Sequence, residues 1–233
     1  MKPPKRSLLI LILGLLSAIG PFSIDMYLPG FPVIADSLGT TVDRVAYSLS
    51  SFFIGLCAGQ LIVGPLLDRF GRKKPLCTGL VVYIIATVGC SMATTVEALI
   101  AFRFIQALGC CVGMVAPNAM VRDLFPVAEN AKVFSLLILI LGVSPILAPT
   151  VGSFVVAAFG WPMVFTVLAA VTALILGIVF VWLPESKGAD EGVSLKPKPI
   201  LSGYANVIKK PQFRTYAFAG AIASAGLFAY LAG

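Results

Sequence analysis

Residues 133–184 have the sequence VFSLLILILGVSPILAPTVGSFVVAAFGWPMVFTVLAAVTALILGIVFVWLP and contain no charged side chain. Folded as one helix, this stretch would be about 78 Å long, because an α-helix rises 1.5 Å per residue. A hydrocarbon core about 30 Å thick is crossed by about 20 apolar residues. The stretch is therefore long enough for two crossings. The breaker FGWP at 159–162, near its middle, predicts where the chain turns back.

The rest of the chain repeats this pattern of long apolar blocks. The other blocks, uncharged except for Arg103 in the fourth, are 7–24, 45–67, 75–96, 98–121 and 215–233. Hydrophobic residues make up 59% of the chain and charged residues only 12%, against about 25% charged in a typical soluble domain. The sequence therefore predicts an all-α polytopic membrane protein with seven spans. The first block is too long for a signal peptide and no small-x-small cleavage site follows it, so we expect it to be retained as a span.

The composition also argues against several kinds of site. The chain has five cysteines and no histidine, and the cysteines lie in or at the edges of predicted spans. Their spacing matches no metal site, so we interpret them as small packing residues. No catalytic dyad or cofactor loop is visible. We therefore expect no metal, no cofactor and no enzymatic activity.

Lysine and arginine lie almost entirely on one side of the predicted spans. Of the 17 in the chain, 15 lie in segments 1–6, 68–74, 122–132 and 185–214, which alternate crossings bring to the same side. Short loops rich in positive charge face the cytoplasm, so we expect a cytoplasmic amino terminus. The net charge of +7 is thus a topology signal. We expect contact with a lipid bilayer and none with nucleic acid.

The predicted spans divide the chain into three parts. Residues 1–184 form a six-span bundle, residues 185–214 form a polar cytoplasmic linker, and residues 215–233 form the seventh span. Six spans, a basic linker and a further span are typical of the first half of a twelve-span transporter, whose halves consist of three-plus-three inverted repeats. No clear sequence repeat relates the first three spans to the next three, so the symmetry is an expectation.

Two ionisable residues within spans are candidates for function, because a charge in the membrane is costly. Asp25 follows the first block and Arg103 lies near the start of the fourth, so we expect both at a similar depth towards the outer face. They can pair or share a water-filled site, and an embedded carboxyl group can bind and release a proton. Gln106, one turn from Arg103, and Asn118, deeper in the span, can supply hydrogen bonds. The alternatives are a helix-end position for Asp25, snorkelling for Arg103 and helix contacts for the two amides.

The loop after the second predicted span carries the strongest motif, GPLLDRFGRKK at 64–74. Gly71 allows a tight turn, and Asp68 with the basic cluster can form a charge network with Asp123 at the end of the fourth span. A loop that only follows the distribution of positive charge needs its cations, but not Asp68, Gly64 and Gly71. The motif resembles the loop signature of the major facilitator superfamily, G-x-L-x-D-R-x-G-R-[RK], in the position after the second span.

Two further segments extend this resemblance. Arg103 and Gln106, followed by Gly109, resemble the fourth-span motif of the family, although Ala107 replaces the usual glycine. The segment DMYLP at 25–29 resembles the first-span signature of drug:proton antiporters, and more narrowly of the bicyclomycin and chloramphenicol resistance subfamily. The resemblance covers nearly the whole chain and implies the major facilitator fold, with an amino-terminal six-helix bundle plus the seventh helix of a truncated twelve-span protein.

The fifth predicted span carries a partial match to the antiporter motif of the family, GVSPILAPTVG at 142–152. Pro145 and Pro149 are expected to bend the span, and Gly142 and Gly152 to allow close approach of a neighbouring helix.

Two glycine pairs with four-residue spacing, Gly55 with Gly59 and Gly109 with Gly113, also predict close helix contacts. We expect these contacts within the bundle, with a homodimer face as the alternative.

The resemblance implies roles for two sets of residues. Asp25 would carry the proton and couple it to substrate, and the loop motif would form an inner-surface latch that stabilises the outward-facing state. Ser17 stands where some relatives have a second acidic residue, which leaves a single carboxylate. The coupling set is Asp25, Tyr27, Arg103, Gln106 and Asn118. The gating set is Gly64, Asp68, Arg69, Gly71, Arg72 and Asp123.

The leading functional hypothesis is proton-coupled export of small drugs across the bacterial inner membrane. One alternative is a nutrient or metabolite carrier with the same fold, and another is a membrane scaffold, which would make no use of Asp25 or Arg103. The expected partners are a small-molecule drug, protons, lipid and the missing carboxy-terminal half. Transport is then expected of the intact parent and not of this portion alone.

Overall fold

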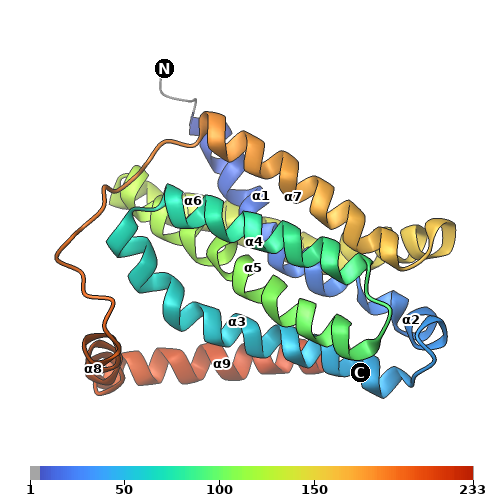
Figure 1. Ribbon diagram of the computed structural model, residues 1–233. Coiled ribbons are helices and arrows are strands. Elements are labelled where there is room, and N and C mark those ends of the chain that lie inside the picture. The colour runs from blue at the N-terminus through green and yellow to red at the C-terminus, as the bar shows by residue number, and fades with distance from the viewer. Residues whose placement is uncertain (1–5, 233) are drawn as a thin grey trace. The chain divides into compact units, whose positions relative to one another are not determined.

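The computed structural model describes residues 6–232, with residues 197, 224 and 227–232 described by their backbone alone. Its regular elements are all helical, as expected, and residues up to 190 form one compact unit (Figure 1). The elements of this unit are α1 (Arg6–Asp25), the short 3₁₀-helix η1 (Leu28–Gly30), α2 (Phe31–Ser37), α3 (Val42–Phe70), α4 (Lys73–Ser91), α5 (Val96–Leu124), α6 (Val127–Phe159) and α7 (Pro162–Trp182).

The turns between these helices follow local sequence signals. Thr41 and Thr95 begin α3 and α5 as N-caps, since each hydroxyl accepts a hydrogen bond from the backbone N–H three residues later. Gly71 and Gly160 both have φ of +83°, a conformation that glycine adopts without steric cost. The predicted tight turn at Gly71 and the predicted chain reversal at 159–162 are therefore confirmed.

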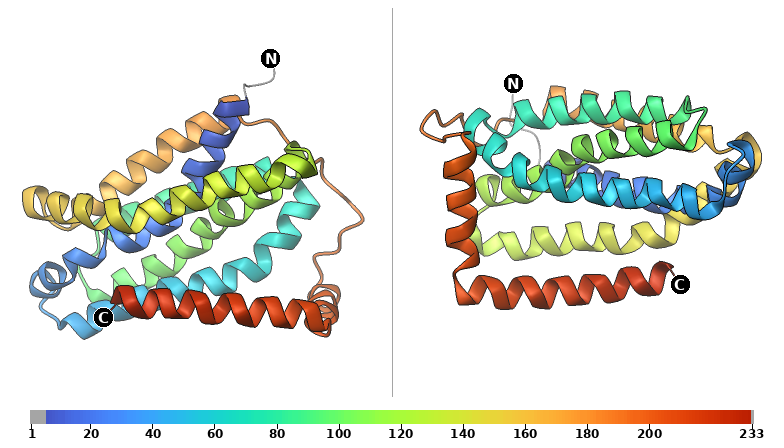
Figure 2. Two further views of the ribbon diagram at one scale, coloured as in Figure 1. Left: turned by 180° about the vertical axis from the view of Figure 1, so that it is seen from behind. Right: turned by 60° about the horizontal axis from the view of Figure 1, so that its bottom comes forward.

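Among the described residues, six helical segments are long and apolar enough to cross a membrane. They are Arg6–Ser37, Val42–Phe70, Lys73–Ser91, Val96–Leu124, Val127–Phe159 and Pro162–Trp182. Their number and order match the six spans predicted before residue 185. In two further views the long helices of this unit again run side by side (Figure 2).

The bundle has two halves, α1 to α4 and α5 to α7. The first long helix of each half is exchanged, since it packs against helices of the other half. α5 packs mainly against α3 and α4, whereas α1 packs mainly against α6 and also contacts α5 and α7. The first long helix of each half thus lies against the two later helices of the other half. This arrangement is the one expected of three-plus-three repeats.

Glycine backbones allow the closest of these contacts. A Cβ atom at Gly109 would lie 2.5 Å from the backbone nitrogen of Tyr83 on α4, and one at Gly55 would lie 2.7 Å from the carbonyl oxygen of Phe104 on α5. At Gly59, Cys111 Sγ would be 2.7 Å away. The prediction that both glycine pairs pack within the bundle is confirmed for these residues, and Gly113 lies more loosely against α1, with its nearest atom at 3.5 Å.

The basic segments of this unit lie at one of the two ends of the bundle, and each end has an ion pair. Arg6 pairs with Glu129 at 3.1 Å at the end that also holds residues 68–74 and 122–132. Arg44 pairs with Glu97 at 3.0 Å at the opposite end, where α3 and α5 begin. The structure therefore gathers the basic segments of this unit at one end.

Residues 191–233 form a second unit. It contains α8 (Pro197–Ile208), a helix inside the predicted polar linker, and α9 (Pro211–Ala232), which includes most of the predicted seventh span. Gly233 lies outside the described residues, and the crossing by segment 215–233 stays a prediction. Residues 185–190, where the predicted linker begins, belong to the first unit.

Candidate functional site

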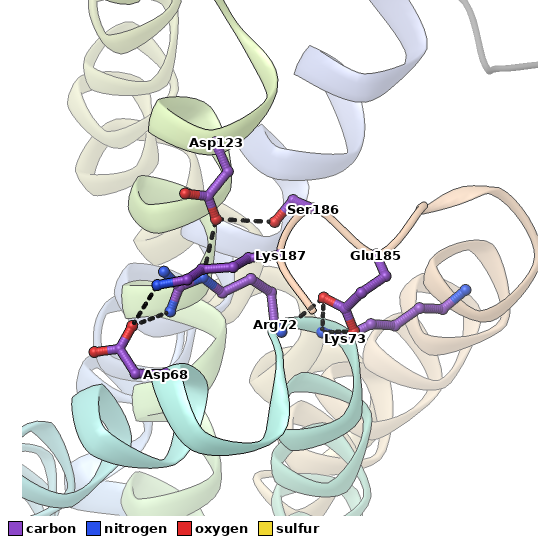
Figure 3. Close-up of polar contacts among 7 residues, drawn as sticks. All are labelled: Asp68, Arg72, Lys73, Asp123, Glu185, Ser186 and Lys187. Atoms are coloured by element: carbon purple, nitrogen blue, oxygen red, sulfur yellow. Dashed lines mark hydrogen bonds and ion pairs between the residues drawn. The ribbon is translucent and has the colours of Figure 1, made fainter. Parts of the chain in front are cut away.

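Arg72 is the centre of a charge network at the basic end of the bundle. Its Nε donates to Asp123 Oδ2 at 2.9 Å, and its Nη1 donates to Asp68 Oδ1 at 2.8 Å (Figure 3). The residue is only 7% exposed. Burial lowers the pKa of the guanidinium, but hydrogen bonds and charges from Asp123 and Asp68 outweigh that effect and raise it. Arg72 therefore stays charged and ties the end of α3 to the end of α5.

The segment that follows α7 closes this network from the side. The Glu185 carboxylate accepts hydrogen bonds from the backbone N–H groups of Arg72, at 2.7 Å, and Lys73, at 3.1 and 3.2 Å (Figure 3). These groups begin α4, so a carboxylate from elsewhere in the chain occupies the positive end of that helix. Ser186 Oγ donates to Asp123 Oδ2 at 3.1 Å, and Lys187 Nζ lies 3.8 Å from Asp68.

The structure thus adds three residues, 185–187, to the predicted gating set. Sequence reasoning placed them in a linker, since nothing in the residues PES at 184–186 shows which helix end they meet. Lys73 strengthens the same connection, because its Nζ donates to the Phe180 carbonyl of α7 at 2.9 Å.

The remaining members of the predicted gating set lie around this network. Gly71 is buried in the turn, where an added Cβ would lie 3.0 Å from Glu185 Oε2. Arg69 donates to the Asp190 carbonyl at 3.5 Å, and Gly64 lies half-buried in α3 before Pro65. The structure brings Asp68, Arg72 and Asp123 into direct contact, while Arg69 points to the segment after α7.

A second polar cluster surrounds Arg103 inside the bundle. The Arg103 side chain is fully buried, and its Cζ lies 4.6 Å from the Tyr27 ring centroid, 4.2 Å from that of Phe52 and 5.9 Å from that of Phe165. Aromatic faces attract a guanidinium electrostatically. Tyr27 is itself held by a 2.7 Å hydrogen bond with Ser48. Arg103 is therefore enclosed by rings from three different segments and does not snorkel.

Hydrogen bonds connect this cluster to α1 and α4. Arg103 Nη1 donates to Gln106 Oε1 at 2.7 Å and to the Ser23 carbonyl at 3.1 Å, and Gln106 Nε2 donates to Thr87 Oγ1 at 2.8 Å. Ser23 Oγ lies 2.6 Å from the Tyr83 hydroxyl. The structure therefore brings Tyr27, Arg103 and Gln106 together and adds Ser23, Thr87 and Tyr83 to them. Sequence reasoning passed over these hydroxyls because none of them carries a charge, the signal that identified Asp25 and Arg103.

Asp25 lies beside this cluster but not in it. It is the last residue of α1 and is 7% exposed. The contacts of Arg103 fall on Ser23 and Tyr27, two residues to either side, which confirms that Asp25 and Arg103 lie at the same level. Within the described residues no hydrogen bond or ion pair joins the two side chains, so the pairing that the sequence allowed is not formed. Among the described residues, the buried Asp25 carboxylate thus has no cationic partner.

Other predicted residues lie apart from the cluster. Asn118 is exposed and its Nδ2 donates to the Met114 carbonyl of its own helix at 3.0 Å. An added Cβ at Gly152 would collide with the Met26 backbone, so the predicted close approach is confirmed there. The same expectation is wrong for Gly142, since a Cβ there would have no described atom within 4 Å. α6 continues through Pro145 and Pro149 as one helix, and their bending of the span stays a prediction.

Comparison with known proteins identifies the family that the chain matches. The profile described as Major Facilitator Superfamily matches residues 13–233. The chain is 34% identical over 231 residues to the uncharacterized MFS-type transporter YdgK of Bacillus subtilis (strain 168), which covers 98% of this chain and 58% of that protein. It is 33% identical over 222 residues to a bicyclomycin resistance protein homolog of Haemophilus influenzae, covering 95% of this chain and 56% of the relative.

Two further matches are a third sequence relative and a solved structure. The multidrug resistance protein MdtL of Escherichia coli is 36% identical over 180 residues, which cover 76% of this chain and 46% of the relative. The crystal structure of the human organic anion transporter MFSD10 (TETRAN) superposes with a TM-score of 0.63 at 17% identity, covering 88% of this chain and 57% of that one. The chain spans about half the length of the relatives that it matches.

Proposed function

Because the chain belongs to the Major Facilitator Superfamily, we propose that it forms the amino-terminal part of a proton-coupled transporter that exports small drugs. Two relatives carry the names bicyclomycin resistance protein homolog and multidrug resistance protein, which supports this substrate class. The transporter would lie in the bacterial inner membrane, as a multi-pass protein with its amino terminus in the cytoplasm. The basic end of the bundle, with residues 68–74 and 122–132, would then face the cytoplasm.

The observation that carries the proposal is the Asp25 carboxylate. It lies in a membrane bundle, is 7% exposed and has no cationic partner in the described residues. A carboxyl group in such a place can exchange a proton, whereas an ion pair with Arg103 would hold it in the charged form. Arg103 Nη1 donates to Ser23 and Gln106 and not to Asp25. Asp25 would then bind a proton or a polar group of the substrate in turn.

The charge network around Arg72 would serve as the gate. It joins α3, α5 and the segment after α7 at one end of the bundle, far along the helices from the level of Asp25. Rearrangement of the network would couple opening of that end of the bundle to movement of the second half of the transporter. Asp68, Arg72 and Asp123 form its ion pairs, and Glu185 fixes the turn between them.

Drug accumulation in cells tests the proposal. A version of the protein that continues through its second half is expressed in an efflux-deficient bacterium, and uptake of bicyclomycin and chloramphenicol is measured with and without an uncoupler. We expect lower accumulation with the protein, loss of that effect with the uncoupler, and the same loss for Asp25→Asn. Asp36→Asn, at an exposed carboxylate of α2, is the matched control and should transport normally.

Two results separate the alternatives. If Asp25→Asn at equal membrane expression exports drugs as well as the unmodified protein, the coupling role of this carboxylate is excluded. A panel of drugs and metabolites in proteoliposomes, with and without a pH gradient, distinguishes drug export from nutrient transport by which compounds follow the gradient.

A further inference from the structure

Residues 196–214 form a basic segment of the chain. They include Lys196, Lys198, Lys209, Lys210 and Arg214, and no acidic residue lies among them. The structure folds the middle of this segment into α8, Pro197–Ile208. A polar tether between two spans has no need of a helix, so the presence of α8 requires its own explanation.

α8 has two distinct faces. At 100° per residue, Ile200, Leu201, Tyr204, Val207 and Ile208 fall on one side of the helix. Leu201 is 65% exposed and Ile208 is 56% exposed. The opposite side carries Ser202 and Asn206. An apolar stripe this exposed on a helix of mixed character is typical of a segment that lies on a surface.

The lysines of α8 are placed for a negatively charged surface. Lys198 and Lys209 fall on the same edge between the apolar and polar faces, and Lys196 and Lys210 flank the helix. Flexible lysine side chains at that edge extend to the height of phosphate groups while the apolar side chains enter the layer beneath. A protein partner would need acidic residues matched to four separate lysines, whereas an anionic bilayer offers phosphates at every point.

The connections of α8 place such a bilayer within reach. α7, a span candidate, ends at Trp182, and α9 begins at Pro211, directly after Lys210. We propose that α8 lies in the headgroup layer of a membrane rich in anionic phospholipid, with its apolar face about 5–10 Å into the boundary with the acyl chains. The predicted linker is then a lipid-binding element, a role separate from transport.

Thiol labelling of the 233-residue chain in nanodiscs tests this placement. Single variants Leu201→Cys and Ile208→Cys lie on the apolar face, and Ser202→Cys and Asn206→Cys are matched controls on the polar face. A membrane-impermeant maleimide is added to discs of equal parts phosphatidylglycerol and phosphatidylcholine, and intact mass gives the labelling rate. The unmodified chain, whose five cysteines lie in membrane helices, supplies the background. We expect the apolar-face variants to react at least tenfold more slowly than the controls.

The charge dependence identifies the surface. In discs of pure phosphatidylcholine, or when the four lysines at 196, 198, 209 and 210 are changed to glutamine, the difference between the faces should shrink to about threefold or less. Equal rates at all four positions in anionic discs would mean that α8 is a free linker. Protection of Leu201→Cys and Ile208→Cys that is unchanged by lipid charge and by the glutamine variant would mean that protein covers this face. Either of these two results overturns the proposal.

Discussion

Adding one methyl group at Gly109 should separate α4 from α5. In Gly109→Ala the new Cβ would lie 2.5 Å from the Tyr83 nitrogen, 2.6 Å from the Gly79 oxygen and 2.9 Å from the Tyr83 Cα. Unstrained contacts of this kind are about 3.5–4.0 Å, so the helices must move apart by about 1 Å. All three atoms belong to the backbone, and no side-chain rotation can relieve the overlap.

The size of the effect follows from two opposing contributions. Overpacking a close contact costs about 1–3 kcal/mol, and alanine in place of glycine favours a helix by about 1 kcal/mol. We therefore expect Gly109→Ala to lower the free energy of unfolding by up to about 2 kcal/mol, and to be about 1–3 kcal/mol less stable than an alanine variant without the contact. Gly142→Ala, where nothing described lies within 4 Å, keeps only the second contribution and should be neutral or slightly stabilising.

Titration with sodium dodecyl sulfate in mixed micelles measures these differences. The helical circular dichroism signal of the 233-residue chain gives the unfolding midpoint for the unmodified protein, Gly109→Ala and Gly142→Ala. A Gly109→Ala variant that is stabilised as much as Gly142→Ala would refute the close approach of α4 and α5. An equal loss in both variants would show that the cost arises from alanine itself and not from the contact.

The charged residues give three more predictions, each measured by the same titration. Arg72→Gln should lower the free energy of unfolding by about 1–3 kcal/mol because two carboxylates lose their cation. Adding Asp123→Asn should recover part of that loss, and strictly additive losses from the two substitutions would contradict a direct pair. Glu185→Gln should lower the free energy of unfolding by about 1 kcal/mol, since it removes a negative charge from the start of α4. An unchanged unfolding midpoint would exclude this stabilisation of α4 by Glu185. Arg103→Met should be more stable than Arg103→Lys, because only lysine retains a buried charge without the hydrogen bonds of a guanidinium; the reverse order would contradict the enclosed position of Arg103.

The helices and their order could be predicted from the sequence because every membrane crossing has the same length requirement. Each crossing needs about 20 apolar residues, and charges at Arg44, Asp68 and Glu97 mark where crossings stop. Turn chemistry then located the reversals, as Gly71 and Gly160 confirm through their positive φ. These signals are local, and a local signal can be recognised without knowledge of which helices touch.

The contacts of the candidate site depended on information that the sequence does not carry locally. Arg103 and Asp25 were both identified as embedded charges, yet their similar depth did not show whether they pair. The structure directs the Arg103 guanidinium to Ser23 and Gln106 and encloses it with Tyr27 and Phe52. Such a choice depends on how α1 is rotated about its axis, which is fixed by packing against α5 and α6.

The exchange between the two halves of the bundle can occur without a visible repeat in the sequence. α5 lies against α3 and α4 through Gly55, Gly79 and Gly109, whereas Gly152 on α6 faces the backbone of Met26, the residue after the end of α1. The same architecture is thus built from glycines on different helices and at different spacings. Packing requires only that one side of each contact be small, so the two halves can keep a common arrangement while sharing no common motif. The candidate coupling residues Asp25 and Arg103 lie on α1 and α5, the exchanged helices that bring the halves together.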